Sequence, residues 1–239
     1  MSDLSQLKFF TTQQHPCSYL EDRQATTLFL DPATLPDKKL HSALSREGFR
    51  RSGNYLYRPH CKHCNACIPV RVDLARFVPN RRFKRISRLN QHLQVSLEPA
   101  RFEEEFFELY VRYIAARHKG GDMYPPHREQ FDQFLFGRWS DTHFACFRNQ
   151  GKLISVAVID LLDDGWSAVY NFFDPQEQRR SLGTYSILWQ ITEGQRLSLP
   201  YLYLGYLIEQ SPKMSYKADF APLQMFTAFG WQAYQPNSD

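Results

Sequence analysis

Apolar residues recur every three or four positions in several stretches of the chain, which is the spacing of one face of an α-helix. The longest such stretch predicts a helix over 102–118. A shorter helix should begin after Asp37, whose carboxylate can cap a first turn, and should end at Gly48. A third helix is expected around 131–135. By contrast, 55–72 is punctuated by prolines and is expected to form a loop.

The pattern becomes strand-like after residue 142, where valine, isoleucine and aromatic residues gather. Three strands are expected, over 142–148, 152–161 and 166–173. The turns between them are predicted at 149–151 and at 163–165, both of which contain glycine. Because consecutive strands with short connections pair in sequence order, these three should form an antiparallel meander.

The remainder of the chain returns to alternating element types. A loop over 179–184 should open a helix that runs to about residue 197. A strand is expected over 199–206, then a helix over 222–228 and a last short strand around Trp231.

This order of elements matches the acyl-CoA N-acyltransferase (GNAT) fold, an α/β fold with a mixed, largely antiparallel sheet and flanking helices. The match is an analogy of fold and does not assign a function. Clustered cysteines and basic residues distinguish the beginning of the chain from the rest. We therefore expect a smaller cysteine-containing N-terminal region over 1–95 and a GNAT-like transferase domain over 96–239.

Composition and charge narrow the class of protein. Hydrophobic residues make up 43% and charged residues 23% of the 239 residues, which predicts a packed core. The net charge of +4 is modest, so a nucleic-acid partner would need a local basic patch. The beginning of the chain lacks the pattern of a secretory signal, and no apolar run is long enough to cross a bilayer. These features favour a cytoplasmic protein without a membrane partner, and no DNA partner is expected.

Three of the five cysteines follow one another at CxxC spacing, at Cys61, Cys64 and Cys67. Zinc or an iron–sulfur cluster requires four ligands, and Cys17 is the first candidate for the fourth, with His60 and His63 as alternatives. The spacing does not separate zinc from an iron–sulfur cluster. The competing interpretation is that these thiols pack a small subdomain. Cys146 lies in a strand pattern and is expected in the core.

Two segments could bind phosphate groups. The loop before the predicted helix at 182 offers free backbone amides beside two arginines, at Arg179, Arg180, Ser181, Gly183 and Thr184. The basic run near residue 80 interleaves cations with phenylalanine, and its candidates are Arg81, Arg82, Lys84 and Arg85. The alternatives are an ordinary strand-to-helix turn and a solvated helix face.

Twelve short segments together resemble the arginyl-tRNA–protein transferase family, and they cover nearly the whole chain. In the first half they are 17–20 (CSYL), 22–25 (DRQA), 48–51 (GFRR), 57–61 (YRPHC) followed by Cys64 and Cys67, 68–71 (IPVR), 83–85 (FKR) and 121–126 (GDMYPP). In the second half they are 168–170 (AVY), 172–175 (FFDP), 181–186 (SLGTYS), 204–206 (LGY) and 213–217 (KMSYK). The short form of the chain is similar to the bacterial aspartate/glutamate leucyltransferase branch.

The resemblance implies a specific reaction. An enzyme of this branch would transfer leucine from leucyl-tRNA to the α-amine of proteins that begin with Asp or Glu, marking them for degradation. Its co-substrate would be an aminoacyl-tRNA, with no cofactor certain. The alternatives are transfer of arginine from arginyl-tRNA, a coenzyme A-dependent N-acetyltransferase, and a non-catalytic, metal-stabilised RNA-binding module.

Such a reaction needs a proton acceptor, an oxyanion donor and a cation that selects the acidic residue. Within the segments above, the catalytic candidates are Tyr170, Asp174 and Lys217. Arginine binds a carboxylate through two parallel hydrogen bonds. The candidates for selecting the acidic N-terminus are Arg23, Arg58 and Arg71, all in segments around the cysteine cluster.

Overall fold

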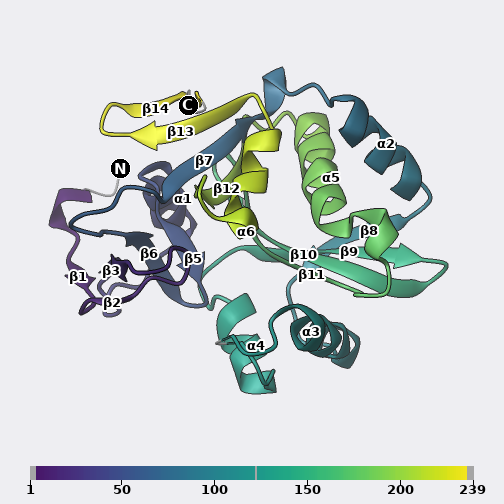
Figure 1. Ribbon diagram of the computed structural model, residues 1–239, viewed down its shortest axis with the longest axis horizontal. Coiled ribbons are helices and arrows are strands. Elements are labelled where there is room, and N and C mark those ends of the chain that lie inside the picture. The colour runs from purple at the N-terminus through teal and green to yellow at the C-terminus, as the bar shows by residue number, and fades with distance from the viewer. Residues whose placement is uncertain (1–3, 122, 236–239) are drawn as a thin grey trace.

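The computed structural model describes residues 4–121 and 123–235 (Figure 1). Asp122, which belongs to the 121–126 segment, and the first three and last four residues of the two expected regions lie outside the described residues. The α-helices are α1 (Lys38–Arg46), α2 (Arg81–Asn90), α3 (Glu104–Arg117), α4 (Arg128–Leu135), α5 (Leu182–Arg196) and α6 (Pro212–Ser215). Short 3₁₀ turns lie at η1 (Leu4–Gln6), η2 (Leu74–Arg76), η3 (Gln178–Arg180) and η4 (Tyr216–Asp219).

An eight-stranded sheet forms the centre of the molecule, in the order β14-β13-β7-β12-β11-β10-β9-β8 (Figure 1). Its strands are β7 (Ile68–Asp73), β8 (Gln94–Pro99), β9 (Thr142–Asn149), β10 (Lys152–Leu162), β11 (Gly165–Phe173), β12 (Tyr201–Leu207), β13 (Leu223–Thr227) and β14 (Gly230–Ala233). The predicted meander of β9, β10 and β11 is confirmed. Every pairing is antiparallel except that of β11 with β12.

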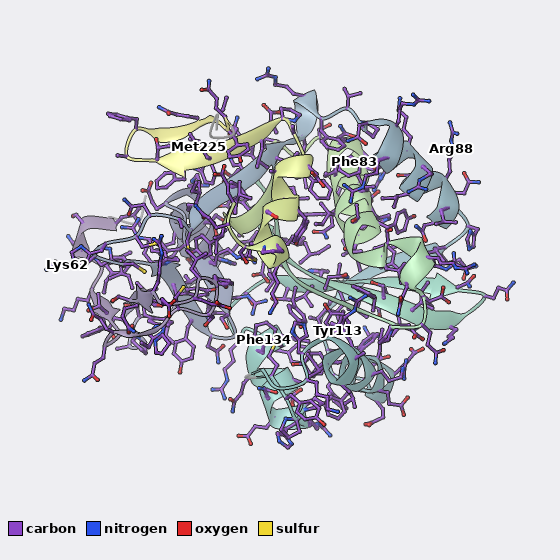
Figure 2. All side chains as sticks on the ribbon, viewed as in Figure 1. Lys62, Phe83, Arg88, Tyr113, Phe134 and Met225 are labelled. Carbon is purple, nitrogen blue, oxygen red and sulfur yellow. The ribbon has the colours of Figure 1, made fainter. Side chains whose placement is uncertain are left out.

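Helices cover both faces of this sheet, which confirms the expected mixed α/β class. On one face α3 and α4 bury Phe106, Tyr110 and Phe131 against β9, β10 and β11. On the other face α5 packs beside α2, whose Phe83 and Ile86 are buried while its basic residues stay exposed. Figure 2 shows this division on α2, with Phe83 turned inward and Arg88 pointing away from the body of the molecule.

A smaller unit lies at one side of the central sheet. Its four strands run in the order β1-β4-β6-β5, with β1 (Phe9–Thr11), β4 (Thr27–Leu30), β5 (Arg50–Ser52) and β6 (Tyr55–Pro59). The separate pair β2 (His15–Pro16) and β3 (Gln24–Ala25) lies beside it. Helix α1 begins as predicted, because the Asp37 carboxylate accepts a hydrogen bond from the Leu40 amide at 2.7 Å.

Two expectations were wrong, and both concern strands. The segment 55–72 contains β6 and β7, with Pro59 and Pro69 near strand ends, where a missing amide donor is tolerated. The helix expected over 222–228 is strand β13, which pairs with β7 and β14. In both cases partners distant in sequence determine the structure.

The expected division at residue 95 stays a prediction. Strand β7 and helix α2 come from its N-terminal side and β8 spans residue 95, yet both strands pair within the eight-stranded sheet. Among the described residues, the structure has no helix that is both long and apolar enough to cross a membrane.

Candidate active site

Strands β11 and β12 separate after a short parallel stretch, in which 165–167 pairs with 201–203. Farther along, the guanidinium of Arg50 reaches from β5 to β11. Its Nη2 donates to the carbonyl oxygens of Ala168 at 2.9 Å and Val169 at 3.2 Å. The opening between the two strands is therefore partly filled by an arginine from the smaller unit.

Gly205 on β12 permits this approach. Its φ of +77° lies in the left-handed region, and an added Cβ would lie 2.3 Å from Arg50 Nη1. Nearby, the register between β10 and β11 shifts and leaves Val169 without a partner in β10, which forms a bulge. The backbone on both sides of the opening is therefore irregular.

Lys217 lies beside this opening, on η4. Its side chain is buried, with 6% exposed, and its amine donates to the carbonyl oxygen of Tyr206 and lies 3.6 Å from the sulfur of Met214. Burial, followed by the positive charge of Arg50, lowers the pKa of Lys217 to about 7. A substantial fraction of this amine is therefore neutral near neutral pH.

The other two catalytic candidates have different surroundings. Tyr170 lies among rings of the α3 and α4 face, with Phe134 at 5.0 Å between centroids, and its hydroxyl is 3.8 Å from the sulfur of Met123. Burial raises the pKa of Tyr170 well above its usual value. Asp174 is buried at the end of β11, where it accepts from Lys152 Nζ at 3.0 Å and from the Gln176 amide at 3.0 Å. Its carboxylate is therefore already paired.

A cleft of about 690 Å³ opens between the smaller unit and the edge of the central sheet. Tyr19, Tyr57, Tyr206 and Phe226 contribute aromatic walls. Burial raises the pKa of Tyr206 well above its usual value, and its hydroxyl donates to backbone carbonyl oxygens, so this ring forms a fixed wall. The cleft is large enough for one or two amino-acid side chains.

The four clustered cysteines all line this cleft, and none forms a disulfide. Burial, followed by electrostatic repulsion from the neighbouring Cys17, Cys61 and Cys64, raises the pKa of Cys67 to about 12. Within 4–121 and 123–235, no three His, Cys, Asp or Glu side chains approach as the ligands of one metal ion would. As arranged, the thiols share a cleft without forming a coordination shell, so no chemical step is derived through a metal.

Two of the three arginines expected to select an acidic residue also line the cleft. Arg23 is exposed, with Nη1 3.4 Å from the Cys64 sulfur, and Arg58 lies 5.1 Å over the Phe49 ring. Arg71 lies elsewhere. It is buried on β7, stacks 3.5 Å over the Tyr201 ring and donates to two side chains, so its guanidinium is occupied.

The candidate phosphate-binding residues lie on adjoining elements. Arg81, Arg82, Lys84 and Arg85 are exposed on α2. The C-terminal residue of α2, Asn90, donates to the Arg180 carbonyl oxygen at 2.9 Å, which joins this helix to the 179–184 loop. In the loop, Arg179 and Ser181 are exposed, and Gly183 and Thr184 are half-buried at the start of α5. These residues form one surface, which we call the basic band.

Comparison with known sequences decides the family. Sequence models described as "Arginine-tRNA-protein transferase, N terminus" and "Arginine-tRNA-protein transferase, C terminus" match residues 15–85 and 105–227. The chain belongs to the arginine-tRNA–protein transferase family. This result confirms the resemblance that the short segments indicated.

Three relatives that this family member matches over nearly its whole length are named aspartate/glutamate leucyltransferase. The relative from Alcanivorax borkumensis is 56% identical over 239 residues, which are 100% of this chain and 99% of the relative. That from Pseudomonas fluorescens is 53% identical over 231 residues (97% and 98%), and that from Pseudomonas aeruginosa is 52% identical over 236 residues (98% and 99%). The resemblance to the leucyltransferase branch is thereby confirmed.

Among solved structures, L-PGS from Bacillus licheniformis is similar to this family member with a TM-score of 0.50 at 12% identity. The likeness covers 73% of this chain and 61% of that chain. At this identity it bears on the fold alone, and it agrees with a largely antiparallel sheet flanked by helices.

The sequence analysis did not single out Arg50 as a site residue. Arg50 lies within the 48–51 segment and Gly205 within 204–206, so both positions belonged to the resemblance without a role. Two sequence features could have indicated these positions: consecutive arginines in one segment, and a glycine in the interior of a predicted strand. Only the structure shows that these two residues meet.

Proposed function

We propose that this protein transfers leucine from leucyl-tRNA to the α-amine of proteins that begin with Asp or Glu. The observation that carries the proposal is the match, over the full chain and above 50% identity, to relatives named aspartate/glutamate leucyltransferase. The modified proteins would thereby be marked for degradation, in the cytoplasm. The partners are leucyl-tRNA and acceptor proteins, without DNA or a membrane.

The aminoacyl end of the tRNA enters the opening between β11 and β12, by analogy with the GNAT fold. Support comes from the parallel pairing that ends after three residues, the bulge at Val169 and the loop that follows β11 into α5. Free amides at the start of α5 and the cations of the basic band bind the phosphates of the acceptor stem. The basic band adjoins this opening through α5.

The reaction forms one covalent bond and breaks another. The α-amine nitrogen of the acceptor attacks the ester carbonyl carbon of leucyl-tRNA, a C–N bond forms, and the ester C–O bond breaks. The ammonium loses a proton to neutral Lys217, and the departing ribose hydroxyl gains one. Because the ester is already activated, no covalent enzyme intermediate is required. The lowered pKa of Lys217 suits this role.

Tyr170 and Asp174 are assigned supporting parts in this proposal. The Tyr170 ring packs below β11 and holds the bulged segment in place. Asp174 fixes the end of β11 through Lys152 and the Gln176 amide, where the loop toward α5 begins. Both residues therefore position the backbone that faces the donor.

The acceptor polypeptide occupies the cleft. Arg23 and Arg58 lie at its walls and attract an acidic N-terminus electrostatically. Arg71 contributes by holding β7 against β12 through Tyr203 and against β13 through Gln224. The opening that holds the donor is connected to this cleft through Tyr206, which belongs to both.

Cys17, Cys61, Cys64 and Cys67 are proposed as candidate ligands of zinc or an iron–sulfur cluster, which would fix the wall of the cleft. The support is that four thiols line one cleft and that Cys67 lies within the field of the other three. Metal analysis of protein purified without oxygen tests this. Metal in stoichiometric amount that is lost in Cys64→Ser supports it, and no bound metal contradicts it.

A transfer assay tests the proposed function. Purified protein is mixed with a peptide beginning with Asp and with one labelled donor at a time: leucyl-tRNA, arginyl-tRNA or acetyl-CoA. Label from leucyl-tRNA alone is the expected result. Label transferred from arginyl-tRNA or from acetyl-CoA would show that this compound, and not leucyl-tRNA, is the donor. Binding of tRNA without transfer from any donor would refute the assignment of an enzymatic activity. Lys217→Met, assayed in parallel, shows whether the label depends on the site described.

A further inference from the structure

Two neighbouring arginines on β5 have opposite surroundings. Arg51 is buried and fully paired: its Nε and Nη2 bind the Asp160 carboxylate at 2.6 and 2.9 Å, and its Nη1 donates to the Gly53 carbonyl oxygen. Arg50 has two hydrogen bonds to carbonyl oxygens from Nη2 only. Its Nη1 is buried and has no partner. A buried donor without a partner is costly, so Arg50 needs a further acceptor.

Among the residues that the structure describes, no carboxylate neutralises Arg50. Across the part of the chain that the structure describes, Arg50 forms no ion pair with Asp or Glu. The groups whose pKa feels its charge are Tyr19, His41, Tyr57, Tyr206, Tyr216 and Lys217. None of them is a carboxylate, and His41 and Lys217 are bases.

Arg50 lies next to the acceptor cleft without lining it, and its neighbours on β12 connect it to both substrates. Gly205 has no side chain and lies against the guanidinium, and the next residue, Tyr206, accepts from Lys217 and lines the acceptor cleft. The guanidinium with its unpaired Nη1 and the amine assigned as proton acceptor therefore meet two adjacent residues of β12. An anion bound here would lie beside the reacting amine.

We propose that Arg50 binds the side-chain carboxylate of the acceptor's first residue and so selects Asp and Glu. This inference rests on the proposed function. The first residue of such an acceptor carries its carboxylate two or three carbons from the α-carbon, so carboxylate and α-amine can reach Arg50 and Lys217 together. A charge-assisted hydrogen bond from Arg50 Nη1 discriminates against the neutral amides Asn and Gln, which cannot compensate the charge.

Arg23 and Arg58 fit this task less well than Arg50. Arg23 is exposed, so solvent screens its charge. Arg58 is half-buried, as Arg50 is, but its Nη1 already donates to the Glu47 carbonyl oxygen at 3.3 Å. An ion pair in water discriminates weakly, whereas a pair removed from water leaves a costly unpaired group when the substrate lacks its charge. We therefore assign them to attraction and Arg50 to selection.

The test compares peptides that differ only in their first residue, Asp against Asn and Glu against Gln, with leucyl-tRNA as donor. For the unaltered protein, kcat/KM should favour the acid over the amide. In Arg50→Met this ratio should fall by roughly 30-fold or more, while transfer to the Asn peptide changes little. Arg50→Lys should keep part of the preference because it keeps the charge without the fork. Arg101→Met, which removes an exposed arginine, is the matched control and should leave the ratio unchanged.

Several results would overturn the assignment. If Arg50→Met lowers transfer to both peptides equally, the residue has a structural role, and thermal unfolding of the variant shows this directly. If the KM for leucyl-tRNA rises while the ratio of acid to amide stays constant, the anion at Arg50 belongs to the tRNA. A constant ratio with unchanged KM means that only water binds Nη1. Absence of transfer by the unaltered protein would instead refute the proposed function. This outcome is therefore distinguishable from a failure of the Arg50 assignment alone.

Gly205→Ala provides an independent check that leaves the charge in place. The added methyl group would collide with Arg50 Nη1 and displace the guanidinium. We expect the preference for Asp over Asn to fall in the same direction as in Arg50→Met. An unchanged preference would show that the position of the guanidinium beside Gly205 is irrelevant to selection.

Discussion

Arg50 and Arg51 are adjacent in sequence and belong to two different charged centres, because Arg51 is buried whereas Arg50 is half-buried with only its Nη1 shielded from solvent. The centre around Arg51 is complete: Asp160 also accepts from Thr142 at 2.7 Å, and His41 lies 3.8 Å from it. The centre around Arg50 combines that cation with the Lys217 amine, whose pKa is lowered to about 7, and among the described residues Arg50 forms no ion pair with Asp or Glu. Adjacent strand residues point to opposite faces, so one arginine fastens the smaller unit to β10 and the other enters the opening beside β12.

The difference between the two arginine centres distinguishes a contribution to stability from a contribution to function. A buried ion pair with all its hydrogen bonds made contributes to holding two units together, and removal of one partner leaves a charge stranded. A buried cation without a counter-ion is expensive in the free protein and is compensated when an anionic ligand arrives. Disruption of the first centre should therefore change unfolding, and disruption of the second should change turnover and selectivity.

Lys217→Met is expected to have the largest effect on turnover, a fall in kcat of about 100- to 10,000-fold, because the proton acceptor is lost. The pH profile sharpens this. Lys217 accepts a proton only above its pKa of about 7, so kcat/KM should rise with pH through that region. The α-amine of the acceptor must also lose its proton, near ~8, in both proteins, so the variant should keep only this second rise. An unaltered profile in the variant would remove Lys217 from the mechanism.

Asp160→Asn tests the complete centre. The variant leaves the buried Arg51 charge without its partner, and we expect a loss of about 3–5 kcal/mol in the free energy of unfolding. Denaturant unfolding of both proteins measures it. The folded fraction should retain the preference for Asp over Asn peptides. A large change in that preference with little change in stability would reverse the roles given to the two centres.

Reversal of charge on the basic band should act on the donor alone. In Lys84→Glu combined with Arg85→Glu, two exposed cations on α2 are lost. We expect the KM for leucyl-tRNA to rise about tenfold or more at low salt, with a weaker salt dependence and an unchanged KM for the peptide. A changed peptide KM with an unchanged tRNA KM would place the acceptor on this surface instead.

The smallest effect is expected away from both centres. Asp37→Ala removes the side-chain cap of α1 and should cost about 1 kcal/mol of stability. Chemical unfolding measures this loss, and kcat/KM at a temperature where the variant is folded should equal that of the unaltered protein. Selectivity that changes with this cap would mean that α1 is coupled to the site.

The local pattern of apolar and polar residues predicted the helices and strands that are stabilised by neighbours in the sequence. The helical spacing over 102–118 identified α3, and the strand pattern from 142 identified the meander. The strands β6, β7 and β13 were missed because each is short and is stabilised by a partner distant in the chain. The spacing of apolar residues along a segment does not indicate which distant strand the segment will pair with.

The residues of the candidate site, like the elements of the fold, could be predicted from the sequence only in part. Segment matching brought together the four cysteines, Arg23 and Arg58, and the structure shows that they share one cleft. The difference between Arg50 and Arg51 was not predictable, because Asp160 lies 109 residues away from Arg51 along the chain. The sequence shows two adjacent arginines, and tertiary contacts decide which one is already paired.

A single competition experiment tests the central claim most directly. Leucyl-tRNA is supplied to the unaltered protein with equal amounts of four peptides that begin with Asp, Asn, Lys and Ala, and the products are quantified by mass spectrometry. The account predicts leucine on the Asp peptide in large excess over the Asn peptide, with the Lys and Ala peptides unmodified. Comparable modification of the Asp and Asn peptides would contradict a selective buried cation, and leucine on the Lys peptide would contradict the proposed acceptor class.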